Sequence, residues 1–186
     1  MTGYYKVADF VFAVTLRQEY NLDVLLPSFC SFKCNEVPDD ELLFRLVEEG
    51  VEKESPYAEF LEDDDNDVGQ TRLYRIPEGY RITLRYSGPS HVIEADQNFR
   101  HVSALLRWED ANVPTALSSM LRIAFAQAVL MHSAISLHSS VVVKDGKGYM
   151  FMGRSGTGKS THSRLWLEHM EGSRLLNDDN PVVRIV

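Results

Sequence analysis

Residues 153–160 have the sequence Gly153-Arg154-Ser155-Gly156-Thr157-Gly158-Lys159-Ser160. The stretch fits the pattern G-x-x-x-x-G-K-[ST], which forms a loop that cradles phosphate groups. Its glycines lack a Cβ, so the backbone can adopt positive φ and turn several N–H groups toward one anion. We therefore expect residues 153–161, with Thr161 as the last, to bind the phosphates of a nucleotide.

The last two residues of the pattern have separate expected roles. Lys159 places a compact positive charge where the β- and γ-phosphate oxygens would lie. The Ser160 hydroxyl is a ligand for the Mg²⁺ that bridges those oxygens. A helix that begins here adds the positive end of its dipole. The expected ligand is a nucleoside triphosphate with Mg²⁺.

Such a loop functions between a strand and a helix, and both flanks fit. Residues 148–152 form a short run of strand character. Residues 160–170 have helical spacing, ended by Gly172, with one face made of His162, Leu165, Trp166 and His169. The flanks favour a phosphate-binding loop over a glycine-rich surface turn. We expect the two histidines to pack or to lie on the helix surface.

The strand before the loop is expected to be the second arm of a hairpin. Residues 137–143 have a strand pattern, and Lys144-Asp145-Gly146-Lys147 contains the Asp-Gly pair of a tight turn. Downstream, residues 174–176 form a short strand that ends in Asn177-Asp178-Asp179. Two carboxylates would then lie near the loop. Asp and Asn also suit turns, so these residues have a purely structural alternative.

Together, His138, the hairpin, the loop 153–160 and the Asp178-Asp179 pair resemble the catalytic domain of HPr kinase/phosphorylase and its relative, ATP-dependent phosphoenolpyruvate carboxykinase. The resemblance covers only the C-terminal part of the chain. It implies that Lys159 contacts phosphates, that Ser160 and Asp179 hold Mg²⁺, and that Asp178 is the general base on a seryl hydroxyl. His138 would tune that base, although a histidine at a strand start is often structural. Phosphoryl transfer from ATP to a protein serine or a small-molecule hydroxyl is the implied reaction.

The chain departs from the family pattern in places. It has Ser139 where the family has Gly, and Thr161 where the family has an acidic residue. The basic residues that close on the phosphates in the family would lie beyond Val186. We therefore expect either a piece of a longer kinase-like protein or a shortened relative that binds nucleotide without turnover.

Two other functions are compatible with the loop. A non-catalytic nucleotide-sensing module would use its β-rich region to dock a partner protein. The run Gly-Thr-Gly-Lys-Ser-Thr also occurs in transporter-type ATPases, but the aspartates here follow the loop too closely to leave room for their signature. The family forms oligomers, so the resemblance also implies self-association.

Composition indicates a folded, soluble, cytoplasmic protein. The chain has 186 residues, 44% hydrophobic and 25% charged, which is ordinary for a globular protein. A net charge of −8 disfavours nucleic acid or an anionic membrane as partner. Cys30 and Cys34 lack further zinc ligands and are expected to be free thiols. Asp9 interrupts the first apolar run, which argues against a secretory leader.

The remaining patterns predict the fold class. Alternating apolar residues at 10–16 and 42–46, and a meander over 70–108, indicate an antiparallel β-rich region over residues 1–112. The acidic run 62–67 is expected to be a mobile loop. A helix over 113–135, with polar residues that disfavour a membrane span, is expected to bridge to the loop. Its expected apolar face, at helical spacing, consists of Leu117, Met120, Leu121, Ala124, Ala128 and Met131. Residues 113–186 would form the nucleotide-binding unit, so the predicted class is α+β or α/β.

Overall fold

The computed structural model describes residues 1–17, 20–50, 57–66 and 69–185. The chain is mostly β, with 43% of residues in strands and 25% in helices. It divides into two compact units, Met1–Met131 and His132–Val186, and each is described here by itself. The α+β or α/β class predicted from the sequence is wrong. A large mixed sheet forms the first unit, and the strand pairs described in the second are antiparallel, with a single α-helix beside them.

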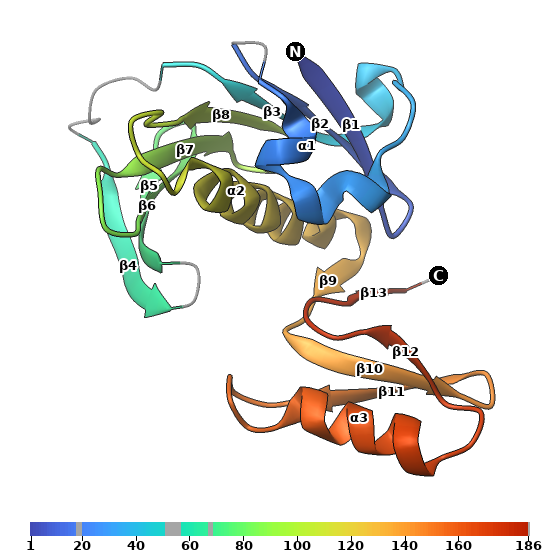
Figure 1. Ribbon diagram of the computed structural model, residues 1–186. Coiled ribbons are helices and arrows are strands. Elements are labelled where there is room, and N and C mark those ends of the chain that lie inside the picture. The colour runs from blue at the N-terminus through green and yellow to red at the C-terminus, as the bar shows by residue number, and fades with distance from the viewer. Residues whose placement is uncertain (18–19, 51–56, 67–68, 186) are drawn as a thin grey trace. The chain divides into compact units, whose positions relative to one another are not determined.

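The first unit is built on an eight-stranded sheet in the order β1-β2-β3-β8-β7-β6-β5-β4 (Figure 1). Its strands are β1 (Thr2–Val7), β2 (Phe10–Thr15), β3 (Leu42–Glu48), β4 (Glu59–Asn66), β5 (Gly69–Ile76), β6 (Gly79–Arg85), β7 (His91–Asp96) and β8 (His101–Leu105). The meander predicted over residues 70–108 is confirmed as β5 to β8.

The sheet is not purely antiparallel as predicted, because β3 pairs in parallel with both β2 and β8. The chain between β2 and β3 is long enough for a crossover, which parallel neighbours require. It contains α1 (Leu22–Leu25) and the short 3-10 helices Pro27–Phe32 and Asp39–Glu41. Alternation of apolar residues predicts a strand but not the direction of its neighbour.

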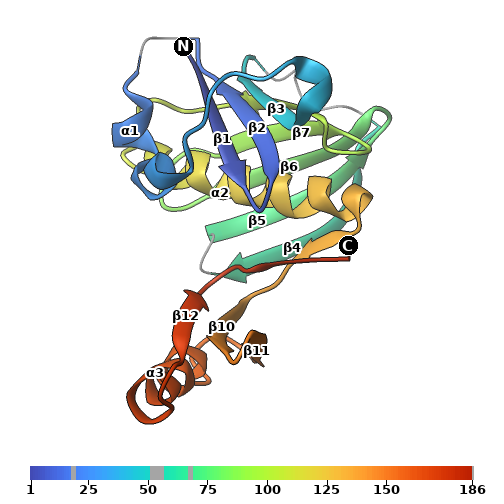
Figure 2. The same ribbon diagram turned by 90° about the vertical axis from the view of Figure 1, so that its right-hand side faces the viewer.

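Helix α2 (Val113–Ala128) lies across one face of this sheet, as Figures 1 and 2 show. It begins at Val113, has Pro114 in its first turn, and buries an apolar face that includes Leu117, Met120, Leu121 and Ala124. A 3-10 turn, Val129–His132, follows it, so Met131 is exposed rather than part of the predicted apolar face. By length and composition Val113–His132 is apolar enough to cross a membrane, but 56% of that window is buried in the protein. The helix is thus a core element of the first unit, not part of a unit 113–186.

The acidic run predicted as a mobile loop is an edge strand instead. Residues 59–66 form β4, which pairs with β5 at the end of the sheet. The register places Asp63 opposite Arg72 and Glu59 opposite Arg75, which offsets part of the repulsion between carboxylates. Charged side chains on a sheet edge also discourage pairing with another chain. Asp67 lies outside the described residues.

Asp96 stabilises the turn from β7 to β8. Its carboxylate accepts hydrogen bonds from the N–H groups of Arg100 (2.8 Å) and His101 (3.2 Å), and it lies 2.9 Å from the His101 ring nitrogen Nδ1. Burial alone would raise the pKa of Asp96, but these bonds to the ionised form outweigh burial and lower the pKa.

This lowered pKa predicts a pH dependence of stability. The folded pKa lies below the unfolded one, so the contribution of Asp96 is present above about pH 4 and is lost as the pH falls through the folded pKa. We expect Asp96→Asn to lower the free energy of unfolding at pH 7, and the difference from wild type to shrink toward pH 3. Urea unfolding at both pH values measures this. A difference that stayed constant or grew in acid would contradict it.

The second unit contains a three-stranded antiparallel sheet in the order β11-β10-β12, with α3 against it (Figure 1). Its elements are β9 (Ala134–Ser136), β10 (Ser139–Lys144), β11 (Lys147–Met152), α3 (Lys159–His169), β12 (Arg174–Asn177) and β13 (Val182–Arg184). Strands β9 and β13 form a separate antiparallel pair. The predicted hairpin, helix and short strand are confirmed as individual elements.

Local interactions explain this arrangement. Asp145 and Gly146 both have positive φ, 50° and 72°, as expected for a tight two-residue hairpin turn. The rings of Tyr149 and Phe151 on β11 pack against Trp166 of α3, with centroid separations of 4.7 and 5.6 Å. His162 also contacts Phe151, at 4.5 Å, so it packs as expected.

Candidate functional site

The loop that follows β11 has the predicted strand–loop–helix context. Residues 153–158 connect Met152, the last residue of β11, to Lys159, the first residue of α3. Gly156 and Gly158 have φ of 78° and 90°, a region that strains residues with a Cβ, and Gly158 is the helix N-cap. The two glycines therefore allow a backbone course that a chain of other residues would not readily take.

Hydrogen bonds within the loop hold it closed. The Thr157 hydroxyl donates to the Arg154 carbonyl at 2.8 Å. A Cβ at Gly153 would lie 2.6 Å from the Thr157 Oγ1, so the close approach requires glycine there. The Lys159 ammonium donates to the carbonyls of Gly153 (2.9 Å) and Arg154 (3.1 Å). Lys159 thus lies over its own loop, and in the described part of the chain it has no carboxylate partner.

Three polar side chains meet beside the first turns of α3. The Ser140 hydroxyl on β10 lies 2.5 Å from Oδ1 of Asp178, to which it donates. It also lies 2.5 Å from the hydroxyl of Ser163 on α3. Both serines are almost wholly buried, at 0% and 1% exposure. Asp178 is therefore bonded directly to the sheet and linked to the helix through Ser140. Ser140 and Ser163 were not among the site residues predicted from the sequence. The available signal was a serine at a buried strand position before the run Val141–Val143.

A hollow of about 240 Å³ borders this cluster. It is lined by Ser160, Thr161, Ser163, Arg164, Leu167, Leu175 and Asp178. Ser160 and Asp178, a predicted metal ligand and the predicted base, therefore share one hollow. This hollow extends along α3 from Ser160 in the first turn to Leu167, and the positive end of the helix favours anions.

Asp179 and His138 form a separate pair. The His138 ring nitrogen Nδ1 lies 3.3 Å from the Asp179 carboxylate, and both side chains are at least half exposed. The Asp179 carbonyl accepts from the Ser139 N–H at 2.9 Å, and its own N–H donates to Asn177 at 2.9 Å. His138 was expected to tune Asp178, whereas the structure places its ring beside Asp179.

The side chains beside the loop include oxygen ligands of the kind that Mg²⁺ binds. The described residues contain no group of three or more His, Cys, Asp or Glu side chains that could hold a metal ion. Mg²⁺ does not need one, because it is usually bound through one or two carboxylates together with substrate phosphates and water. Ser160 and Asp178, on one hollow beside the loop, fit this requirement. Cys30 and Cys34 are free thiols, as predicted.

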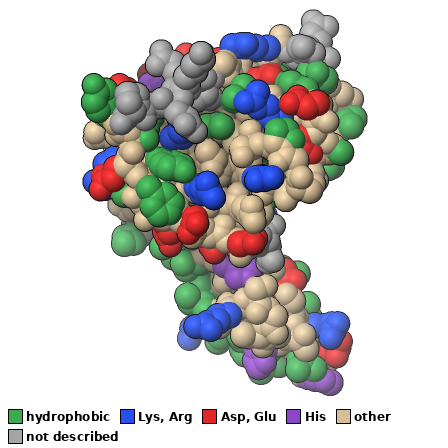
Figure 3. All heavy atoms as spheres, turned by 90° about the vertical axis from the view of Figure 1, so that its left-hand side faces the viewer, with side chains coloured by type: hydrophobic (Ala, Val, Ile, Leu, Met, Phe, Trp, Pro, Cys, Tyr) green, Lys and Arg blue, Asp and Glu red, His purple; other side chains and the backbone are tan. Residues whose placement is uncertain are grey.

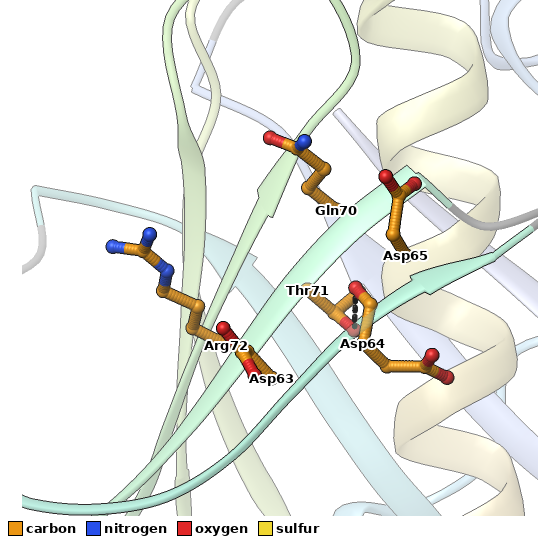
Figure 4. A pocket seen from close by; sticks show the side chains of 6 residues that line it. All are labelled: Asp63, Asp64, Asp65, Gln70, Thr71 and Arg72. Atoms are coloured by element: carbon orange, nitrogen blue, oxygen red, sulfur yellow. Dashed lines mark hydrogen bonds between the residues drawn. The ribbon is translucent and has the colours of Figure 1, made fainter.

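A second hollow, of about 290 Å³, lies on strands β4 and β5 of the first unit. Figure 4 shows Asp63 and Arg72 on one side of the strand ribbon and Asp64 on the other, toward α2. The Thr71 hydroxyl donates to the Asp64 carbonyl at 3.4 Å. Carboxylates line this hollow, so it does not suit a phosphate. On the face drawn in Figure 3, acidic and basic side chains are interspersed rather than grouped by sign.

Comparison with known proteins returned no match for this chain among protein-family models, curated proteins or solved structures.

Proposed function

We propose that the chain binds a nucleoside triphosphate, ATP, together with Mg²⁺ at the loop 153–161. The observation that carries this proposal is the loop itself. It joins a strand to a helix, has left-handed Gly156 and Gly158, and places Lys159 at the helix start. Backbone N–H groups and the positive end of α3 would hold the phosphates. The Lys159 ammonium would exchange its two loop carbonyls for phosphate oxygens.

The proposed activity is transfer of the γ-phosphoryl group to the hydroxyl of a serine or a small molecule. Such catalysis depends mainly on positioning and charge neutralisation. Mg²⁺ bound at Ser160 would neutralise charge on the β- and γ-phosphates. The aspartate pair supplies the two carboxylates that the reaction needs, one toward Mg²⁺ and one to accept the proton of the acceptor hydroxyl. His138 lies beside Asp179 and would tune that carboxylate.

A second candidate function is nucleotide sensing without turnover, with the first unit docking a partner protein. The exposure of the site favours it. Asp178, Asp179 and His138 are all exposed to solvent, whereas a transferase gains from excluding water around its reacting groups.

For either function we place the protein in the cytoplasm, where ATP is abundant, without a nucleic-acid or membrane partner. Self-association stays a prediction from the family resemblance.

Radiolabelled ATP tests the transferase proposal. We expect the protein, incubated with Mg²⁺ and γ-labelled ATP, to label a hydroxyl in a panel of serine peptides and small hydroxyl compounds. Lys159→Ala should reduce the labelling rate at least about 100-fold, because one charged contact to the transferred group is lost. Equal labelling by the Lys159→Ala variant and the wild type would rule out the proposed transferase site at this loop. Binding of ATP with no labelling of any acceptor would select the sensing function.

A further inference from the structure

We propose that Ser140 and Ser163 are positioning residues that hold the Asp178 carboxylate at the hollow of Ser160. Asp178, rather than Asp179, is then the carboxylate that faces Mg²⁺. This assignment rests on the proposed binding of Mg-ATP and exchanges the roles that the family resemblance gives to the two aspartates.

The first support is the way three elements converge. Ser140 lies on β10, Ser163 on α3, and Asp178 directly after β12. The pairing of β10 with β12 shifts register between Val141 and Val142, and Asn177 lies opposite Val141. Because the two strands are antiparallel, Asp178, which follows Asn177, lies beside Ser140, which precedes Val141 in β10.

The second support is the direction of the hydrogen bonds. An ionised carboxylate only accepts, so the Ser140 proton must point to Asp178. Ser163 must then donate to Ser140, because the Ser140 proton is already used. Two buried hydroxyls are satisfied in this way, and one carboxylate oxygen is fixed. In the described part of the chain, the other oxygen of Asp178 has no hydrogen bond, so it is available to a ligand in the hollow.

The third support is the position of Ser160. Residues three apart on a helix lie on the same face, so Ser160 and Ser163 are neighbours on α3. Both line the hollow together with Asp178. Asp179 does not line it, and its side chain and main chain are engaged by His138, Ser139 and Asn177. The carboxylate that accompanies the Ser160 hydroxyl is thus that of Asp178.

The matched control is Ser139→Ala. Ser139 is as buried as Ser140 and adjacent to it, but its hydroxyl has no hydrogen-bond partner among the residues that the structure describes. Removing the Ser139 hydroxyl therefore changes a buried serine of the same strand without touching Asp178. Thermal unfolding of each variant would show which of them retain the fold.

The experiment measures how much Mg²⁺ tightens ATP binding, by calorimetry of the full chain with Mg²⁺ and with EDTA. We expect Ser140→Ala to reduce this enhancement about tenfold, because removing a residue that orients a metal ligand typically costs about 10–100-fold in metal affinity. Ser163→Ala should have a smaller effect, about threefold, because Ser163 contacts Asp178 only through Ser140. ATP affinity in EDTA should not change. Ser139→Ala should match wild type in both conditions.

A second pair of variants tests the assignment without relying on the buried serines. Asp178→Asn should abolish the Mg²⁺ enhancement, whereas Asp179→Asn should keep most of it. The inference is overturned if Ser140→Ala matches Ser139→Ala, or if Asp179→Asn alone loses the enhancement. A wild-type protein that binds no ATP in either condition would instead refute the proposed function.

Discussion

Replacing Lys159 by alanine is expected to weaken Mg-ATP binding by at least about 100-fold. The ammonium is the first side chain of α3 and already lies over the loop, bound to the carbonyls of Gly153 and Arg154. In the complex it would instead bind phosphate oxygens. Hydrogen bonds to charged groups contribute about 1.5–3 kcal/mol each. The loss of two such bonds therefore corresponds to a decrease in affinity of about 100-fold or more. Displacement of a fluorescent ATP analogue would measure the affinity.

The control for this prediction is Lys147→Ala. Lys147 is an exposed lysine of the same unit, at the start of β11, and its removal changes the net charge equally. Its effect should stay within about twofold, because exposed charges are largely screened by salt at physiological ionic strength. Equal effects of the two variants would mean that Lys159 acts only through overall charge, which would contradict a specific phosphate site.

Replacing Phe12 by alanine is expected to lower the free energy of unfolding by about 3–5 kcal/mol, the usual range for a buried phenylalanine. Phe12 is fully buried in β2. Its ring stacks on Phe44 at 4.9 Å and on Tyr5 at 5.6 Å, and it contacts Phe29 and Phe125 edge-on. Urea denaturation followed by circular dichroism would measure the loss.

Phe60→Ala serves as the comparison. Phe60 lies on the edge strand β4, is 54% exposed, and contacts Tyr74 edge-on at 5.7 Å. Its removal should cost less than about 1 kcal/mol, because the side chain already contacts water and leaves no cavity. A loss at Phe12 no larger than at Phe60 would contradict the placement of β2 in the core.

The backbone of the loop 153–158 was predictable because its constraints are local. Positive φ at Gly156 and Gly158, and the Asp145-Gly146 turn, follow from steric limits on single residues. The apolar face of α2 was likewise visible in the spacing of Leu117, Met120 and Leu121. In the loop, the hairpin turn and α2, residues close together in the sequence are enough to specify the local structure.

Features that depend on distant partners were not predictable. The parallel placement of β3 depends on where β2 and β8 lie. The acidic strand β4 pairs with β5, where Arg72 and Arg75 lie across from it, and the charge pattern of the run alone does not contain that pairing.

The candidate site shows the same limit. Adjacent residues at a strand end point in different directions, so which aspartate joins Ser140 and which joins His138 depends on the register of β12 against β10. Spacing along the chain does not contain that register. The partnership of Ser140 and Ser163, which are 23 residues apart, could not be inferred for the same reason.

Calorimetric titration of the folded wild-type chain with Mg-ATP tests the central claim most directly, with adenosine as the ligand that lacks phosphates. We predict saturable binding of one Mg-ATP per chain and no heat with adenosine. Flat traces with both Mg-ATP and Mg-GTP at millimolar concentration, on material with a cooperative unfolding transition, would contradict the claim that residues 153–161 bind a triphosphate.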